Sequence, residues 1–199
     1  MKLFSYVVEH DTGHAPNPFF GTCTLCRCKF RRSFGKPRNV VERARPGDWV
    51  AGTGGADQLK SAGHGRLVYA MRVDEKMTRE DYYSDRRYSR KKPLQNNSAS
   101  QHGDNLRPES AFEKQCQFVL VSRHFYYFGR NAIPIPRERF PDFEKKGPGF
   151  RSDFDEGEVE RFVQWIEAHE PGRRGEPCQK SSPTKREIRA CKSSCCESA

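Results

Sequence analysis

The stretch Arg66-Leu-Val-Tyr-Ala-Met-Arg-Val73 decides the fold, because it alternates between large apolar and other residues more clearly than any other part of the chain. This period of two predicts a β-strand with one buried face. The residues predicted on that face are Leu67, Tyr69, Met71 and Val73. A strand is also predicted to begin at Trp49. The glycine-rich connector 53–65 joins the two strands, so we predict an antiparallel hairpin.

Outward from this hairpin, further strands are predicted at residues 3–8, 23–30, 116–122 and 125–128. Residues 31–45 are basic and interrupted by Gly35 and Pro37, which predicts an irregular segment. A short helix is predicted at 78–84 with Thr78 as its N-cap, and the strongest helix at 155–169. Because strands fill the middle and this helix closes the domain, we predict an α+β fold. Its sheet is mixed or antiparallel and partly closed, with the C-terminal helix packed on it.

The composition predicts one domain and a tail. The chain has 199 residues and a net charge of +10. From residue 171 onward Gly, Pro, Ser, Lys and Arg dominate, so we predict one α+β domain at 1–170 and a basic disordered tail at 171–199. The positive charge favours a nucleotide or nucleic-acid partner, since cations near phosphates release condensed counterions. The alternative is a solvated basic surface.

Hydropathy and cysteine usage indicate a cytoplasmic protein. No run of about 18 apolar residues suggests a membrane span, and the N-terminus does not resemble a signal peptide. In a reducing compartment eight cysteines do not predict a disulfide framework. Cys23, Cys26 and Cys28 lack a second Cys-x-x-Cys pair with zinc spacing, so no metal site is predicted. Nothing in the sequence identifies a cofactor.

The first candidate site follows the first predicted strand. His10 and Asp11 are adjacent there, and a histidine beside a carboxylate is suited to general-base chemistry, with the carboxylate orienting the ring. Thr12 and Asn17 add polar groups that could contact a ligand. The alternative is a structural turn in which Asp11 caps the backbone and His10 is partly buried.

Other candidate ligand contacts lie in separate parts of the chain. Glycines next to Thr53 would let the backbone approach a phosphate or base, although the P-loop and dinucleotide-binding fingerprints are absent and a flexible turn is the alternative. Arg66 or Lys29 would lie near phosphate, and a ring of the segment 125–129 would stack on a base. The remaining predicted ligand contacts are Gly54, Asp104, Asn105 and Tyr127.

Several segments in order resemble the second family of nucleotide modification associated domains. They are Tyr-Val-Val-Glu-His-Asp-Thr-Gly-His-Ala-Pro-Asn-Pro-Phe from Tyr6, Cys-Thr-Leu from Cys23, Gly-Asp-Trp-Val-Ala-Gly-Thr-Gly from Gly47, the strand from Arg66, Lys-Lys-Pro from Lys91, Gly-Asp-Asn from Gly103 and Phe-Tyr-Tyr-Phe-Gly from Phe125. The resemblance implies association with systems that install or process modified bases in DNA. It also implies that the polar residues of these motifs share one pocket.

We therefore expect three loops to converge on one ligand: the loop 10–17, the connector at Thr53 and the loop at 104–105. The leading hypothesis is binding or processing of a nucleotide or modified base. The first alternative is a transferase or hydrolase with His10 as base and Asp11 as its partner. The second is an accessory protein that contacts DNA non-specifically, with a steep salt dependence.

Overall fold

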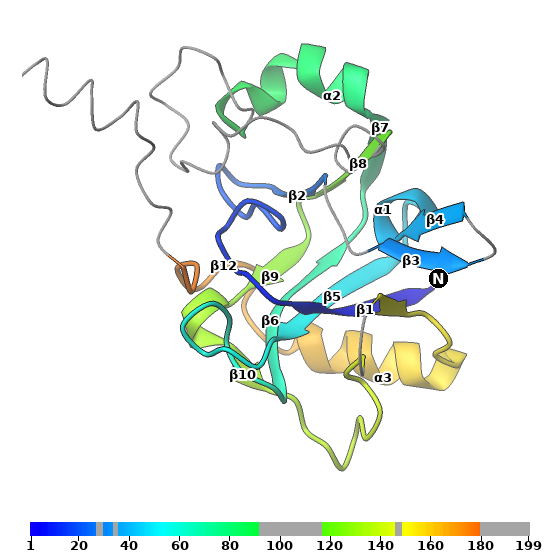
Figure 1. Cartoon of the computed structure of the whole chain (residues 1–199), viewed down its shortest axis with the longest axis vertical. Coiled ribbons are helices and arrows are strands. Elements are labelled where there is room, and N and C mark those ends of the chain that lie inside the picture. Colours follow the sequence, from blue (N-terminus) through cyan, green and yellow to red (C-terminus); the bar gives the residue numbers. More distant parts are fainter. Residues whose placement is uncertain (27–29, 34–35, 92–116, 146–148, 180–199) are drawn as a thin grey trace, which may run out of the picture.

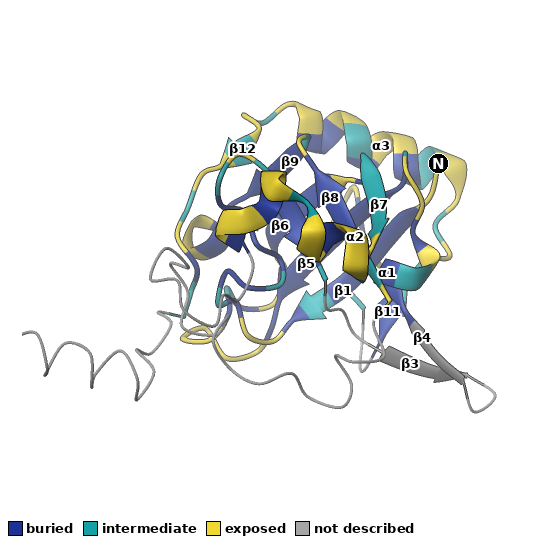
Figure 2. Cartoon of the chain, turned by 90° about the horizontal axis from the view of Figure 1, so that it is seen from above, coloured by how far each residue is buried: buried dark blue, intermediate teal, exposed yellow. Residues whose placement is uncertain are grey.

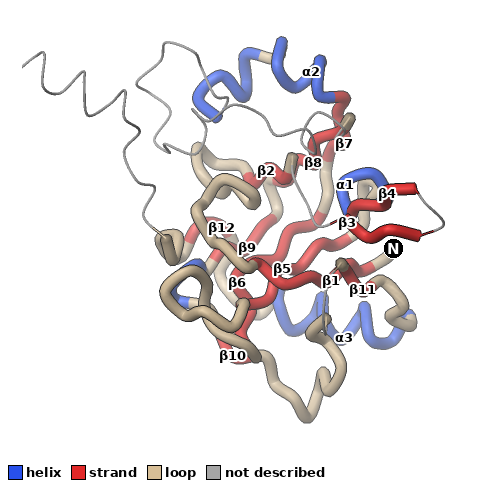
Figure 3. The backbone as a smooth tube through the Cα atoms, in the orientation of Figure 1, coloured by secondary structure: helices blue, strands red, loops and turns tan. Residues whose placement is uncertain are grey.

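The computed structural model describes residues 1–26, 30–33, 36–91, 117–145 and 149–179. Two sheets lie between helix α3 (Glu156–Glu167) and helix α2 (Arg79–Ser84), which stand at opposite ends of the molecule (Figure 1). The strands occupy the middle and the helices lie outside them (Figure 3). The predicted α+β class with a C-terminal helix on the sheet is confirmed.

The main sheet is mixed and does not close on itself. Its path is β11-β1-β5-β6-β9-β12, and β10 also pairs with β6. The bounds are β1 Leu3–Val8, β5 Trp49–Gly54, β6 Arg66–Arg72, β9 Phe125–Tyr127, β10 Ile133–Pro134, β11 Phe150–Arg151 and β12 Gly172–Arg173. β1 runs parallel to β5, and β12 runs parallel to β9. β5 and β6 are antiparallel, so the predicted hairpin is confirmed.

A β-bulge in this hairpin corrects one predicted face. Gly52 pairs with Tyr69 but Thr53 pairs with Leu67, so Val68 is the extra residue on β6. An extra residue shifts the alternation by one position. Leu67 belongs to the core cluster on the α3 side. The other residues predicted on this face belong together to the opposite cluster, as predicted: Tyr69, Met71 and Val73. The prediction was wrong for Leu67, because it assumed unbroken alternation.

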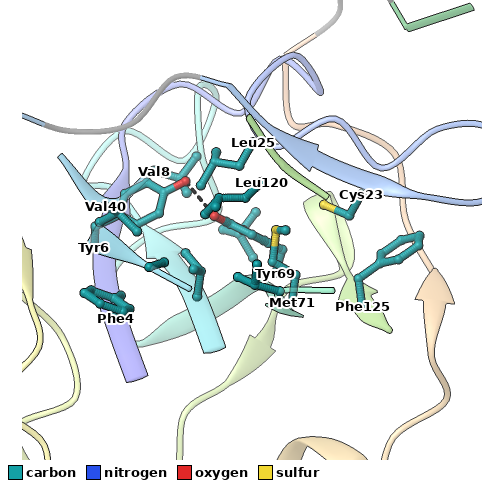
Figure 4. Packing of buried hydrophobic residues seen from close by; sticks show 14 of the residues in the cluster. Phe4, Tyr6, Val8, Cys23, Leu25, Val40, Tyr69, Met71, Leu120 and Phe125 are labelled. Carbon is teal, nitrogen blue, oxygen red and sulfur yellow. Dashed lines mark hydrogen bonds between the residues drawn. The ribbon is translucent and has the colours of Figure 1, made fainter. Parts of the chain in front are cut away.

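The second sheet covers the face of the main sheet opposite α3. It consists of β2 (Cys23–Leu25), β8 (Phe118–Ser122) and β7 (Glu75–Thr78), in the order β2-β8-β7. Figure 4 shows the core between the two sheets, where Leu25 and Leu120 meet Tyr69. The Tyr6 and Tyr69 hydroxyls lie 2.8 Å apart in this core and form a hydrogen bond. Figure 2 shows that the strands of the main sheet are largely buried, as expected for a sheet covered on both faces.

Helix α3 packs on the other face through an aromatic cluster. Phe162 is fully buried, stacks on Phe143 at 5.0 Å between ring centroids and meets Trp49 edge-on. The helix begins with a capping box, in which Asp155 accepts from the Glu158 backbone and the Glu158 side chain accepts from the Asp155 backbone. These reciprocal bonds satisfy two backbone donors that a helix start leaves open.

The remaining elements are short. They are β3 Phe30–Ser33, β4 Lys36–Asn39, α1 Val40–Arg43, the 3-10 helices η1 (Arg86–Lys91) and η4 (Gly129–Asn131), and α2. The Thr78 hydroxyl accepts from the Asp81 backbone, so the predicted N-cap of α2 is confirmed. The prediction that residues 31–45 are irregular was wrong, because they include the β3–β4 pair and α1.

Part of the predicted tail is ordered. Gly172 and Arg173 extend the main sheet beside β9, and the Gln179 backbone N–H donates to the Asp11 carbonyl. The prediction of disorder was therefore wrong for residues 171–179, because their hydrogen bonds to distant parts of the chain outweigh a polar composition. Residues 180–199 lie outside the described residues.

Candidate functional site

The loop after β1 and the connector after β5 lie side by side. We call residues 9–22 the β1–β2 loop and residues 55–65 the connector. Because β1 and β5 are parallel and Val8 pairs with Gly54, both strands end at the same edge of the sheet. The Asp11 backbone N–H donates to the Lys60 carbonyl at 2.8 Å. Two of the three loops predicted to converge therefore meet, and residues 104–105 of the third lie outside the described residues.

The connector is fixed where it approaches β1. The fully buried Ser61 hydroxyl donates to the Val8 carbonyl and accepts from the Gly55 backbone N–H at 3.0 Å. Gly54 and Gly63 touch so closely that a Cβ built on Gly54 would lie 2.0 Å from the Gly63 carbonyl oxygen. The glycines thus allow two backbones to pack together, rather than leaving a flexible turn.

Asp11 is the buried anchor of the β1–β2 loop. Its carboxylate accepts from the Tyr127 hydroxyl at 2.6 Å and from the Cys178 backbone at 3.0 Å, and it also bonds to the Cys178 thiol. Burial raises the pKa of this carboxyl group, and the hydrogen bonds oppose that rise. Burial and the nearby carboxylate raise the pKa of the Cys178 thiol to about 12. Asp11 therefore joins the loop to β9 and to the segment after β12.

His10 lies on the surface beside this anchor. Its Nδ1 is 3.0 Å from the Gln179 side-chain oxygen, which accepts a hydrogen bond from a protonated Nδ1. The predicted His10–Asp11 pair does not form, since the Asp11 carboxylate bonds to Tyr127 and Cys178 instead. The sequence missed this because adjacent side chains diverge and the competing partners lie more than a hundred residues away.

Lys91 is a second buried anchor, which the sequence showed only as part of a basic loop. Its ammonium group donates to the backbone carbonyls of Asn17 at 2.8 Å and Thr22 at 2.7 Å, and to the Asn17 side-chain oxygen at 3.1 Å. These acceptors account for all three donors of a lysine. The signal available in the sequence was its position as the first residue of the Lys-Lys-Pro motif. The buried Tyr88 precedes it in η1.

The titration of Lys91 predicts a pH-dependent stability. Burial lowers its pKa from 10.5 to about 8, while the neighbouring Cys23 and Cys26 thiols oppose that shift. The folded protein then binds fewer protons than the unfolded chain between these two values, so unfolding becomes less favourable as the pH rises. From about pH 7 to about pH 9, we expect the wild type to gain about 1 kcal/mol of unfolding free energy relative to Lys91→Met.

Urea denaturation of both proteins at the two pH values measures this difference. Ionisable groups that do not neighbour Lys91 affect both proteins alike and cancel in the comparison, whereas Cys23 and Cys26 interact with Lys91 and do not cancel. An unchanged difference between wild type and variant would show that Lys91 titrates as an exposed lysine.

The other predicted contact residues are distributed between surface and interior. Thr12 is half-buried, and Asn17 is bound by Lys91. Arg66 is exposed and donates to the Ala132 carbonyl at 2.9 Å. Thr53 and Tyr127 are fully buried, and Tyr127 supports Asp11 from the core, so their contact with a ligand stays a prediction. The predicted contacts outside the described residues are Lys29, Asp104 and Asn105.

A protein-family model matches the part of the chain that forms this arrangement. The model of nucleotide modification associated domain 2 matches residues 1–117 and 107–184, which take in both anchors and the connector. The chain belongs to the nucleotide modification associated domain 2 family. The resemblance inferred from the motifs is thereby confirmed. No curated protein and no solved structure matches the chain.

For this nucleotide modification associated domain 2 protein, the match also covers residues 171–179, which supply Cys178 and Gln179 to the β1–β2 loop. Within the described part of the chain, no helix is both long and apolar enough to cross a bilayer.

Proposed function

We propose that the β1–β2 loop and the connector form a surface that binds a nucleotide or a modified base in a DNA-modification system. The observation that carries the proposal is the construction of the loop: two buried anchors, Asp11 and Lys91, hold it, while His10 stays exposed. Buried polar networks of this kind are costly unless fully satisfied, and they hold a site in one geometry. Family membership supplies the ligand class.

In this proposal His10 contacts the ligand and Arg66 lies near phosphate. Ligands commonly bind outside the carboxyl ends of parallel strands, where β1 and β5 both end. The free thiols of Cys23, Cys26 and Cys178 are compatible with a reducing compartment, so we place the protein in the cytoplasm. The geometry favours binding over the predicted His10–Asp11 catalytic pair, because Asp11 does not orient the His10 ring.

Calorimetric titration with deoxynucleotides that carry plain or modified bases tests the proposal. We expect unequal affinities within the panel and a loss of about fivefold to tenfold on His10→Ala, as for one hydrogen bond. His169→Ala, at the end of α3, controls for removal of an imidazole. Equal affinity for all bases, or none for any, contradicts the proposal.

The same proteins separate the alternatives. In an enzyme, His10→Ala abolishes turnover of a modified base while binding persists. For an accessory protein, affinity falls steeply with salt and does not depend on the base. Truncation after residue 179 tests whether the basic residues 180–199 supply such non-specific binding.

A further inference from the structure

The β1–β2 loop holds a phenylalanine in an unfavourable backbone conformation. Phe20 has φ +60°, and it is the non-glycine residue with positive φ in the described part of the chain. A bulky side chain is strained in this left-handed region. Such strain persists only where the surroundings impose it, and it is frequent at ligand sites. The Phe20 side chain is half-buried, so the core does not enclose it.

Two consecutive residues of η1 impose this conformation. Lys91 binds the carbonyls of Asn17 and Thr22, which stand on either side of the strained turn. Arg90 lies over the Phe20 ring, with its guanidinium carbon 3.9 Å from the ring centroid. This is the shortest cation–π separation among the described residues. The turn, the ring and the cation therefore form one fixed unit.

The carboxylate neighbours of the arginine distinguish this unit from a similar arginine–phenylalanine pair elsewhere. Arg151 lies 4.1 Å from the Phe154 ring, but it also pairs with Asp153 and Glu158. Within the described residues, no carboxylate forms an ion pair with Arg90, which is exposed. An exposed guanidinium held over a ring without a carboxylate partner keeps N–H donors available for a ligand.

A second arginine–aromatic pair lies beside this unit. The buried Phe19 ring is 6.3 Å from the Phe20 ring, and Arg173, which also pairs with Glu176, lies 4.7 Å from the Phe19 ring. Phe19 also packs on Gly13, where an added Cβ would come within 2.9 Å of the ring. Aromatic rings interleaved with arginines are typical of surfaces that stack bases and bind the phosphates between them.

We propose that Phe20 and Arg90 form a stacking subsite for the base of a single-stranded or extruded nucleotide, with the edge of Arg90 binding the adjacent phosphate. The inference rests on the proposed function and assigns its base-contacting residues. Stacking on an aromatic ring or guanidinium plane tolerates any base, because every base has a π-face. Discrimination between modified and plain bases is then left to His10 and its neighbours.

A short single-stranded oligodeoxynucleotide with a fluorescent adenine analogue tests the subsite, beside the same strand with an abasic residue in its place. We expect the wild type to quench the analogue and to bind the base-bearing strand about tenfold more tightly than the abasic strand. Phe20→Gly should remove this preference without lowering the melting temperature, since glycine adopts φ +60° freely. Arg90→Gln should weaken binding of both strands.

Phe154→Ala and Arg151→Gln are the matched controls, because they remove an equivalent pair that is neutralised by carboxylates. We expect both to leave the base preference intact. A base preference that survives Phe20→Gly overturns the subsite while leaving the proposed function standing. A wild type that binds neither the oligonucleotides nor nucleotides overturns both.

Discussion

Gly54→Ala should destabilise the protein by at least about 3 kcal/mol, a large part of the stability of an ordinary domain. The added Cβ would stand 2.0 Å from the Gly63 carbonyl oxygen, so a backbone segment rather than a flexible side chain must move. Movement of Gly63 would displace the connector, including the Ser61 bonds to Val8 of β1 and to the Gly55 backbone. Urea denaturation gives the change in unfolding free energy.

Gly47→Ala is the matched control for this variant. Gly47 has φ +91° and no atom within 4 Å of an added Cβ, so alanine there meets a backbone cost but no collision. We expect a loss of about 1–2 kcal/mol for Gly47→Ala. A Gly54→Ala protein as stable as Gly47→Ala would show that the connector does not pack on Gly54 as described.

Asp11→Ala should cost about 2–5 kcal/mol, because it leaves the Tyr127 hydroxyl and the Cys178 backbone N–H buried without their acceptor. Tyr127→Phe should cost about 1.5–3 kcal/mol through loss of one hydrogen bond to a charged group. Asp11→Asn keeps an acceptor oxygen at the same place and should cost less than alanine. The unfolding free energies of the wild type, Asp11→Ala, Tyr127→Phe and the variant with both changes form a double-mutant cycle.

The cycle should give a coupling energy of about 0.5–3 kcal/mol between Asp11 and Tyr127. Strict additivity would contradict the hydrogen bond that places Asp11 in the core. It would also revive the prediction that Asp11 orients His10. Tyr126→Phe is a useful control, since its hydroxyl bonds to His124, in the turn before β9, and not to Asp11.

Local sequence patterns predicted the frame of the fold. The alternation after Arg66 and the glycines before it predicted the β5–β6 hairpin, and Thr78 and Asp155 marked the starts of two helices. The bulge at Val68 escaped prediction, because an extra residue does not change the apolar composition of a strand. The order at 171–179 escaped it because β12 gains its hydrogen bonds from β9, far away in the sequence.

The sequence predicted that the loop around His10 and the connector meet, but not the contacts that each residue makes. Parallel pairing of β1 with β5 brings the connector to that loop. The burial of Asp11 and Lys91 was not predicted, because charged residues in polar loops are usually exposed. Their burial depends on acceptors and donors in Asn17, Tyr127 and Cys178, which no local pattern reveals.

The central claim is that the β1–β2 loop contacts the nucleotide. Photo-crosslinking to single-stranded DNA that contains iodouracil, followed by mass spectrometry of the adducts, tests it most directly. We predict adducts at residues 10–20, above all at Phe20, and their loss from that position in Phe20→Gly. Adducts confined to residues 180–199 or to α3, with none in the β1–β2 loop, would contradict the claim.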